Sequence, residues 1–350
     1  MKEILKELND NGYEAYIVGG YVRDYLLGIN SYDVDICTNA PIEKIMKIFK
    51  GRGRAFKEYY SFHINEGGFN YAITTYRKEL EYRRNKPTKL SVADDLATDL
   101  LRRDFTINTF AIDINDNLID ILGAKKDLDS KLIKVIGDTK KKFTEDKTRI
   151  LRAIRFSCTL DFDLHKDIID FISNNNAYLL NEVPREYKKR ELDKIFDSMN
   201  IDKFFYLVKR YNMAKYFNIK FDVIKRAYNK YGIYSQMECD LPFSNTEKSI
   251  IENIRKLVSQ GNIYFADFDN YTDEELYNAA AILDMEGTIG IIREIRKLHS
   301  MFDIDVSVDV LFRYVGMNNL KRVYRLIERN IMEGKLANNR DSIEDFLRML

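Results

Sequence analysis

The chain has 350 residues, enough for a sizeable core and more than one domain. Its apolar fraction of 45% and charged fraction of 32% are typical of a soluble globular protein and exclude a disordered or membrane-embedded chain. The formal net charge is only +1, so binding to a nucleic acid would require locally sorted lysines and arginines.

Compartment and metal content are predicted from what the sequence lacks. No apolar run reaches transmembrane length, and residues 1–8 read as a charged amphipathic helix without a signal-peptide core. The cysteines, Cys37, Cys158 and Cys239, are far apart, and the three histidines form no metal-binding pattern. We therefore expect a cytoplasmic protein without membrane association or structural zinc.

A strand, a glycine turn, a helix and a second strand follow the first helix. The apolar run at residues 16–18 predicts a strand, and the glycine pair after it predicts a tight turn. Residues 21–27 are expected to form a helix that ends at Gly28, and residues 34–37 a strand.

Two carboxylates and two glycines in this segment suggest its chemistry. Asp33 and Asp35 are two residues apart on a strand, so they share one face and can hold a divalent metal ion. Gly19 and Gly20 let backbone N–H groups approach a phosphate at a helix start, and Arg23 adds a charged donor. Either motif alone favours an ordinary turn or surface strand, but together they indicate a nucleotidyl-transfer site.

The same residues carry a family resemblance. Gly-Gly-x-Val-Arg-Asp, followed by Asp-x-Asp, resembles the DNA polymerase β nucleotidyltransferase superfamily, and more narrowly its class II tRNA nucleotidyltransferase (CCA-adding) and bacterial poly(A) polymerase branch. The resemblance covers about the first 190 residues. It implies an α+β fold, in which a nucleotidyltransferase head with a mixed sheet and helices is followed by an all-α neck, body and tail. The expected boundaries are 1–140 for the head, 141–200 for the neck, 201–270 for the body and 271–350 for the tail.

The rest of the head is predicted as further strands and one long connection. A helix is expected after Pro41, and strands at 59–64 and 69–75 extend a mixed sheet with helices on one side. The polar, basic segment 77–101 is predicted as a loop that ends in a helix from residue 94. Part of it is similar to a flexible loop of the family, but two residues interrupt the match, so no single residue is assigned there.

A cluster of four polar residues precedes the next strand. Arg102 and Arg103 could neutralise phosphate oxygens, while Asp104 and Asn108 could bind ribose hydroxyls. By sequence alone, a surface salt-bridge cluster explains them equally well. The resemblance to the Arg-Arg-Asp-Phe-Thr-x-Asn signature of the family favours nucleotide binding.

A helix predicted over residues 144–156, with Thr144 as its N-cap, offers a way to recognise a base. Asp146 only accepts hydrogen bonds and Arg149 only donates them, and a spacing of three places both on one helix face. Such a pair matches the amino group and unprotonated ring nitrogen of cytosine or adenine and rejects uracil and guanine. Helix physics alone also explains the pattern. Together with Arg152, the pair resembles the family motif in which protein side chains replace a template.

Scattered cations in the later helices are expected, in part, to line a track for the RNA backbone. The candidates are Lys209, Arg210, Lys225, Arg226, Arg296, Lys297, Lys321 and Arg322.

The resemblance implies template-independent addition of CCA to the 3′ end of tRNA from CTP and ATP, with release of pyrophosphate. Asp33 and Asp35 would be the catalytic residues and would hold two Mg²⁺ ions. The partner would be the acceptor stem and T-arm side of tRNA. The alternatives are a poly(A) polymerase, a CC-adding or A-adding partial enzyme, and a catalytically silent RNA-binding protein; either a monomer or a homodimer fits the sequence.

Overall fold

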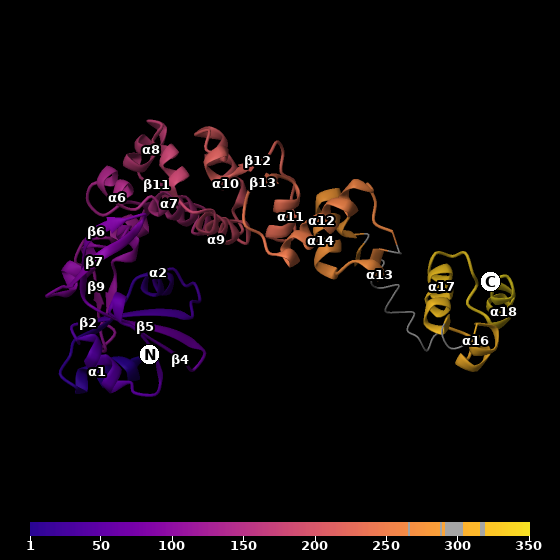
Figure 1. The fold of residues 1–350 in the computed structure, drawn as a ribbon, viewed down its shortest axis with the longest axis horizontal. Helices are drawn as coiled ribbons and strands as arrows, with labels where there is room; N and C mark the ends of the chain where they lie inside the picture. Colours follow the sequence, from indigo (N-terminus) through magenta and orange to yellow (C-terminus); the bar gives the residue numbers. More distant parts are fainter. Residues whose placement is uncertain (265–266, 288, 291–303, 316–318) are drawn as a thin grey trace. The chain divides into compact units, whose positions relative to one another are not determined.

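The computed structural model describes residues 1–264, 267–287, 289–290, 304–315 and 319–350. These residues form two compact units, 1–218 and 219–350 (Figure 1). Arg296, Lys297 and the side chain of Lys321, all predicted to contact RNA, lie outside the described residues. Within the described part of the chain, no helix is both long and apolar enough to span a bilayer.

A seven-stranded mixed sheet organises the first unit, in the order β3-β4-β5-β2-β1-β8-β9. Only β2 and β5 pair in parallel, and the other neighbours are antiparallel. The predicted mixed sheet is confirmed, whereas β3 was not foreseen. The strands are β1 Ala15–Val18, β2 Asp33–Thr38, β3 Gly53–Phe56, β4 Ser61–Glu66, β5 Phe69–Thr75, β8 Ala111–Ile112 and β9 Leu118–Ile119.

Helices α1 (Lys2–Asp10) and α3 (Ile42–Ile48) cover one face of this sheet. Helix α1 buries Ile4, Leu5 and Leu8, the one-turn spacing of an amphipathic helix. Helix α3 packs on β4 and β5, and Phe49 just beyond its end stacks on Phe62 at 6.4 Å between ring centroids. This face therefore forms the main apolar core of the head.

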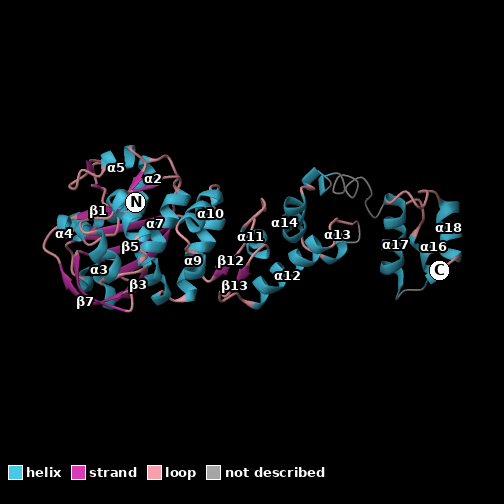
Figure 2. Ribbon diagram, turned by 90° about the horizontal axis from the view of Figure 1, so that it is seen from above, coloured by secondary structure: helices cyan, strands magenta, loops and turns pink. Residues whose placement is uncertain are grey.

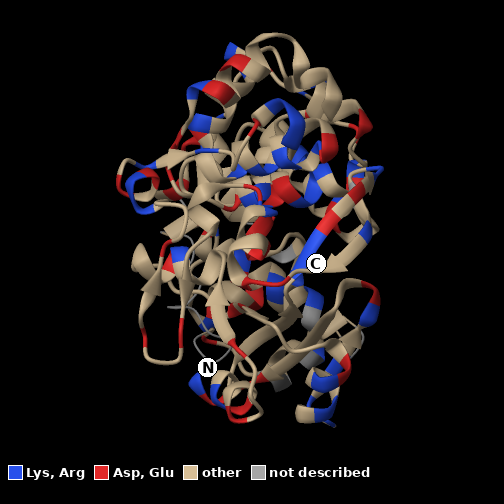
Figure 3. Ribbon diagram, turned by 90° about the vertical axis from the view of Figure 1, so that its left-hand side faces the viewer, with Lys and Arg blue, Asp and Glu red and all other residues tan. Residues whose placement is uncertain are grey.

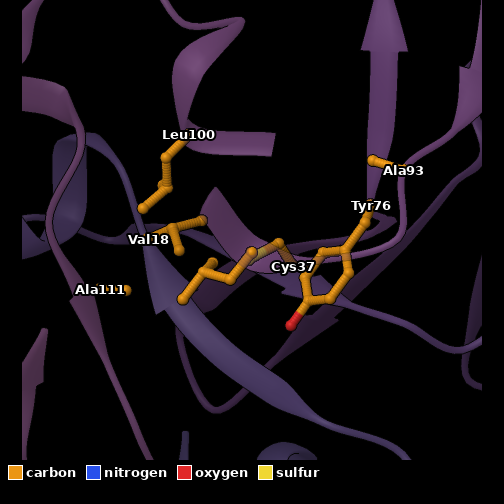
Figure 4. Close-up of a cluster of buried hydrophobic side chains, with 7 residues drawn as sticks. Val18, Cys37, Tyr76, Ala93, Leu100 and Ala111 are labelled. Atoms are coloured by element: carbon orange, nitrogen blue, oxygen red, sulfur yellow. The ribbon is translucent and has the colours of Figure 1, made fainter. Parts of the chain in front are cut away.

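The opposite face of β2 carries the two aspartates and then enters a second apolar cluster. Cys37, two residues beyond Asp35 on the same face, packs with Val18, Tyr76 and Leu100 (Figure 4). Leu100 belongs to helix α4 (Leu96–Leu101), which Asp95 caps by accepting a 2.7 Å hydrogen bond from the Thr98 N–H. The strand that bears the aspartates thus also anchors the helix that leads to Arg102.

The segment predicted as a loop after residue 77 is instead a β-hairpin. Strand β6 (Arg77–Arg83) pairs antiparallel with β7 (Lys86–Val92). Arg84 and Asn85 form the turn with φ of 50° and 62°, the positive values that a tight two-residue hairpin turn requires. The loop prediction was wrong because both faces of this hairpin are largely polar, so no alternation of apolar residues marks its strands.

Short helices complete the first unit (Figure 2). They are α2 Gly20–Leu26, α5 Lys125–Asp129, α6 Thr139–Glu145, α7 Thr148–Thr159, α8 Lys166–Ser173, α9 Arg185–Phe196 and α10 Ile201–Arg210. Strands β10 (Leu132–Ile133) and β11 (Asp163–Leu164) pair in parallel between them. Helix α7 is the most buried of the group, because Ile150, Leu151 and Ile154 are inaccessible to water.

The second unit is predominantly helical, as predicted. Its helices are α11 Lys230–Ser235, α12 Asn245–Ser259, α13 Asp267–Asn270, α14 Asp273–Leu283, α16 Val308–Val315, α17 Leu320–Met332 and α18 Arg340–Arg348. A short antiparallel pair, β12 (Ile219–Lys220) with β13 (Glu238–Cys239), accompanies them. Ser244 with Glu247 and Thr272 with Glu275 form capping boxes at the starts of α12 and α14. The division into head, neck, body and tail at residues 140, 200 and 270 stays a prediction.

Candidate active site

Asp33 and Asp35 project from the same side of β2, as alternation along a strand requires. Both side chains are exposed, whereas Val34 and Ile36 between and after them are buried. Asn70 Nδ2 on the parallel neighbour β5 donates a 2.8 Å hydrogen bond to Asp33 Oδ1, which fixes that carboxylate. Asp35 reaches solvent, but the protein groups packed around its carboxylate partly desolvate it and raise its pKa; Asp33 adds to the rise, whereas Arg103 and Arg102 oppose it.

Gly19 is required at the turn between β1 and α2 for two reasons. Its φ is +78°, a conformation that L side chains rarely adopt. A Cβ there would lie 2.7 Å from Arg103 Nη1 and 3.2 Å from Asp35 Oδ2. The backbone, an arginine and a carboxylate therefore meet at this point.

Gly19→Ala is expected to destabilise the protein by about 1–3 kcal/mol, because the backbone would keep a strained conformation. The new methyl group would also displace the guanidinium of Arg103. Denaturant unfolding measures the loss, with Gly12→Ala as the control, since Gly12 has φ +83° but nothing within 4 Å of its added Cβ. Equal losses in the two variants would show that the close approach of Arg103 costs nothing.

Asp99 is a buried carboxylate that sequence reasoning missed. It accepts hydrogen bonds from Arg102 Nε at 2.9 Å and from Arg103 Nη2 at 3.3 Å. Burial alone would raise the pKa of Asp99, but the charges of these two arginines bring it below its ordinary value. The available signal was its spacing of three and four residues from the arginines on a helix. The buried Asp99 carboxylate therefore holds Arg102 and Arg103 in place.

A buried polar chain runs behind the glycine turn. Arg23 Nη1 donates to Asn108 Oδ1 at 2.7 Å, and Asn108 Nδ2 donates to Asp104 Oδ1 at 3.1 Å. Arg152 Nε donates to Asp104 Oδ2 at 2.6 Å. Burial would raise the pKa of Asp104, but Arg152 and the hydrogen bonds from Asn108 and the Phe105 N–H hold it well below its usual range. These side chains, predicted separately for phosphate, ribose and base, form one network.

The helix predicted to start at Thr144 is instead two helices with a break. Thr144 lies inside α6, and Asp146 follows its end with φ −138° and ψ 100°. Asp146 Oδ1 accepts hydrogen bonds from Thr148 Oγ1 at 2.6 Å and from the Thr148 N–H at 3.0 Å, and so turns the chain into α7. The N-cap prediction was wrong, because α6 begins at Thr139. Its N-cap is Asp138, whose side chain accepts a hydrogen bond from the Lys141 N–H.

Asp146 and Arg149 nevertheless come together. Arg149 Nε lies 3.9 Å from Asp146 Oδ2, and the Arg149 side chain is only 6% exposed. Its other nitrogens are held by the Lys142 carbonyl at 3.0 Å and by Tyr82 Oη at 2.7 Å. Burial raises the pKa of Asp146, although the Thr148 hydrogen bonds and Arg149 lower it.

The β6–β7 hairpin contributes residues that the sequence did not assign. Tyr82 donates to Glu79 and accepts from Arg149. At the tip, Asn85 Nδ2 donates to the Glu182 carbonyl at 3.0 Å, and Asn85 Oδ1 accepts from the Lys147 N–H at 3.1 Å. The hairpin tip therefore contacts both the residue before α7 and the segment after α8.

These side chains line a cavity of about 540 Å³. All the predicted site residues line this cavity except Gly19 and Asp33. The lining also includes residues that were not predicted, among them Glu79, Tyr82, Arg155 and Tyr187. Seven arginines and four carboxylates face this space, whereas charges of both signs alternate over the rest of the described chain (Figure 3). The excess of positive charge in the cavity suits a polyanionic ligand. A larger hollow of about 790 Å³ in residues 220–255 contains none of the predicted residues.

The aspartate pair fits a divalent cation that shares its coordination with a ligand. Among the described residues, no group of three or more His, Cys, Asp and Glu could enclose a metal ion by itself. Two exposed carboxylates on one face, beside an arginine-lined cavity, instead leave coordination positions for phosphate oxygens and water.

Comparisons with known proteins agree with this geometry. Residues 15–134 match the family model of the poly(A) polymerase head domain. The CCA-adding enzyme of Streptococcus thermophilus is 28% identical over 99% of this chain and 96% of its own length. That of Bacillus pumilus is 39% identical over 55% of this chain and 48% of its own.

Solved structures show the same fold. The crystal structure of the Bacillus stearothermophilus CCA-adding enzyme in complex with CTP is similar with a TM-score of 0.70 at 23% identity, covering 99% of this chain and 96% of that one. The Thermotoga maritima CCA-adding enzyme complexed with tRNA has a TM-score of 0.68 at 19% identity, covering 99% and 94%. Residues 15–134, which contain the glycine turn and the aspartate pair, therefore belong to a head domain of the poly(A) polymerase type, and the chain as a whole is similar in sequence and in fold to CCA-adding enzymes.

Proposed function

We propose that this chain adds CCA to the 3′ end of tRNA without a template, taking the nucleotides from CTP and ATP and releasing pyrophosphate. The observation that carries the proposal is that Asp146 and Arg149 share one arginine-lined cavity with Asp35. The full-length similarity to CCA-adding enzymes supports the same activity.

Asp33 and Asp35 are the proposed catalytic residues and the ligands of Mg²⁺. Magnesium is commonly bound by one or two carboxylates together with substrate phosphates, which matches this exposed pair. When bound, two such ions would activate the terminal 3′-hydroxyl and neutralise the leaving pyrophosphate. The hydrogen bond from Asn70 keeps one oxygen of Asp33 oriented.

The triphosphate is proposed to lie between the glycine turn and the arginines. Arg103 lies against Gly19 and Asp35, so its guanidinium can neutralise phosphate oxygens next to the reacting bond. Gly20 and Arg102 line the same space. Arg23 also lines it, but its bonds to Asp24 and Asn108 give it the further task of holding Asn108. Catalysis then consists of positioning and charge neutralisation.

Ribose binding is proposed for Asn108 and Asp104. Both line the cavity, and their mutual hydrogen bond fixes their orientation before a nucleotide arrives. Arg152 completes the pair by its ion pair with Asp104. Preorganised polar groups of this kind lose little freedom on binding.

Base selection is assigned to Asp146 and Arg149. Asp146 Oδ1 is engaged by Thr148, while within the described chain no hydrogen bond reaches Oδ2, which points toward Arg149 Nε. An exocyclic amino group could donate to this oxygen while the guanidinium donates to the adjacent ring nitrogen. Cytosine and adenine satisfy both contacts, and uracil and guanine satisfy neither.

Asp146→Ala is therefore expected to relax discrimination against UTP by roughly tenfold to a hundredfold, because one of the two base contacts is lost. Incorporation rates with CTP and UTP, measured separately, give the preference. Asp146→Asn is the matched control that keeps the size of the side chain. An unchanged CTP preference in the alanine variant would place base selection elsewhere.

One assay separates this function from its alternatives. The protein is incubated with tRNA lacking CCA and with CTP and ATP, singly and together, and the added residues are counted. Addition of CCA followed by a stop supports the proposal, whereas unlimited A indicates a poly(A) polymerase. C alone or A alone indicates a partial enzyme, and no addition indicates an RNA-binding protein.

A cytoplasmic location is part of the same proposal. All three cysteines are free, as expected in a reducing compartment. The acceptor stem and T-arm side of tRNA is the proposed partner of the later helices, with the monomer and the homodimer both compatible.

A further inference from the structure

The sheet face that bears Asp33 and Asp35 continues across the neighbouring strands as an exposed surface. Strand register places Asp35 beside Ala72 of β5, Ala72 beside His63 of β4, and His63 beside Arg54 of β3. Asp33 lies in the parallel row with Asn70 and Asn65. The side chains of Asn65, His63 and Arg54 are exposed. Both rows therefore lead from the carboxylates to solvent.

Three side chains at the far end of this surface contact one another, and we call this cluster the platform. The rings of Phe56 and His63 lie 4.6 Å apart between centroids, and the Arg54 guanidinium lies 5.3 Å from the centre of the Phe56 ring. His63 Nε2 is held by Ser61 Oγ at 3.1 Å. Arg54 forms no ion pair with any residue in the described part of the chain. The platform thus offers aromatic faces and an uncompensated positive charge.

The charge of this surface favours a polyanion. Beyond the aspartate pair, the residues that share this face on β5, β4 and β3 include no carboxylate. They are Asn70, Ala72, Thr74, Ser61, His63, Asn65, Arg54 and Phe56. Aromatic rings combined with arginine are the usual means by which proteins bind unpaired nucleotides, whose bases stack on them irrespective of sequence.

The position of the nucleotide cavity decides what reaches the platform. Strand β2 lies between β1 and β5. The glycine turn after β1, together with Arg103 and Asp104, lines the cavity on the β1 side of Asp35, whereas the platform lies on the β5 side. Phosphoryl transfer is in line, so the attacking hydroxyl must approach from the side opposite to the leaving pyrophosphate. The acceptor strand must therefore come over the β5 side.

Resting on the proposed function, we infer that the platform of Arg54, Phe56 and His63 binds the unpaired nucleotides that precede the 3′-hydroxyl of the acceptor RNA. Neighbouring strands are about 4.8 Å apart, which places His63 roughly 10 Å and Arg54 roughly 14 Å from Asp35. At about 3.4 Å per stacked nucleotide, this distance corresponds to some three or four nucleotides. A 3′ overhang of three nucleotides would reach the platform, and an overhang of one would not.

The test compares two RNA hairpins, one with a single unpaired 3′ nucleotide and one with three. Arg54→Ala and His63→Ala are expected to raise the KM for the three-nucleotide hairpin roughly tenfold each, the loss typical of one stacking contact. The KM for the one-nucleotide hairpin, the KM for CTP or ATP, and kcat at saturating RNA should stay within twofold. His63→Phe, which retains a ring, should keep the affinity of the parent.

Lys44→Ala is the matched control, because Lys44 is an exposed cation on α3, which covers the other face of the sheet. Direct binding of both hairpins without nucleotide, followed by fluorescence anisotropy, gives a readout that needs no chemistry. An unchanged KM and affinity for the three-nucleotide hairpin would overturn the inference, as would equal losses for both hairpins or for Lys44→Ala. If the parent itself added no nucleotide, the proposed function would fail instead, and the anisotropy comparison would still decide the platform.

Discussion

Asp35→Asn is expected to abolish nucleotide addition, with kcat lowered at least about a thousandfold, because loss of one of the two proposed metal ligands would remove several kcal/mol of transition-state stabilisation. Asparagine keeps the size of the side chain but not its charge. Single-turnover incorporation of CMP into tRNA lacking CCA measures the effect. Asp10→Asn, a change at an exposed aspartate that pairs with Lys6 on the surface of α1, should leave the rate unchanged.

The same substitution should not weaken the fold. The pKa of Asp35 is raised in the folded state because surrounding protein groups partly desolvate this exposed carboxylate and Asp33 shares the same face of β2. The folded protein therefore holds this proton more tightly than the unfolded chain, and stability falls as the pH rises from the ordinary pKa through the raised one. At neutral pH the charged side chain is a cost that Asp35→Asn removes, so the melting temperature should stay equal or rise. A folded variant with undiminished incorporation would contradict the assignment of Asp35.

Arg152→Met is expected to lower the free energy of unfolding by about 2–3 kcal/mol, because it leaves Asp104 buried without its partner. The loss should be smaller than for a fully buried pair, since 34% of the Arg152 side chain reaches water, against 9% of Asp104. Methionine retains most of the aliphatic stem, so the change mainly removes charge. Urea unfolding measures the loss, and nucleotide affinity should fall with it because both residues line the cavity.

The pH dependence identifies the cause of that loss. The folded-state pKa of Asp104 lies well below its ordinary value, so its contribution to stability is complete above the ordinary pKa, near 3.9, and is lost as the pH falls toward the depressed one. The difference between parent and Arg152→Met should therefore shrink on acidification below about pH 4. In a double-mutant cycle, Arg152→Met should cost little in an Asp104→Asn background. Equal costs in both backgrounds would show that the two side chains are not coupled.

Strand β2 and the glycine turn could be predicted because their determinants are local. The alternation around Asp33 and Asp35, and the glycines at the start of α2, each specify their own backbone conformation within a few residues. The break at Asp146 could not be predicted in this way, since apolar helical spacing continues across it. Two contacts make the break: the Asp146 side chain binds Thr148, and Asn85 accepts a hydrogen bond from the Lys147 N–H. The second partner is 62 residues away in the sequence.

The hairpin was missed for a related reason. Its strands carry polar residues on both faces, so their order depends on partners that only the folded chain supplies. Tyr82 binds Arg149 across 67 residues, and Asn85 binds the Glu182 carbonyl across 97. Asp99 was overlooked because the sequence does not distinguish a buried carboxylate from an exposed one on a polar helix. Its meaning depends on the two arginines that converge on it.

The cluster around Cys37 changes how chemical modification of this protein should be interpreted. Burial raises the pKa of the Cys37 thiol far above neutrality, so almost none of it is present as the reactive thiolate. Cys37 lies two residues along the strand from Asp35. It packs against helix α4, whose end positions Arg102 and Arg103. If alkylation of Cys37 inactivates the protein, the cause would be a transient opening of the apolar cluster, which exposes the thiol, followed by misalignment of the two arginines. Such inactivation would not reveal a nucleophilic cysteine.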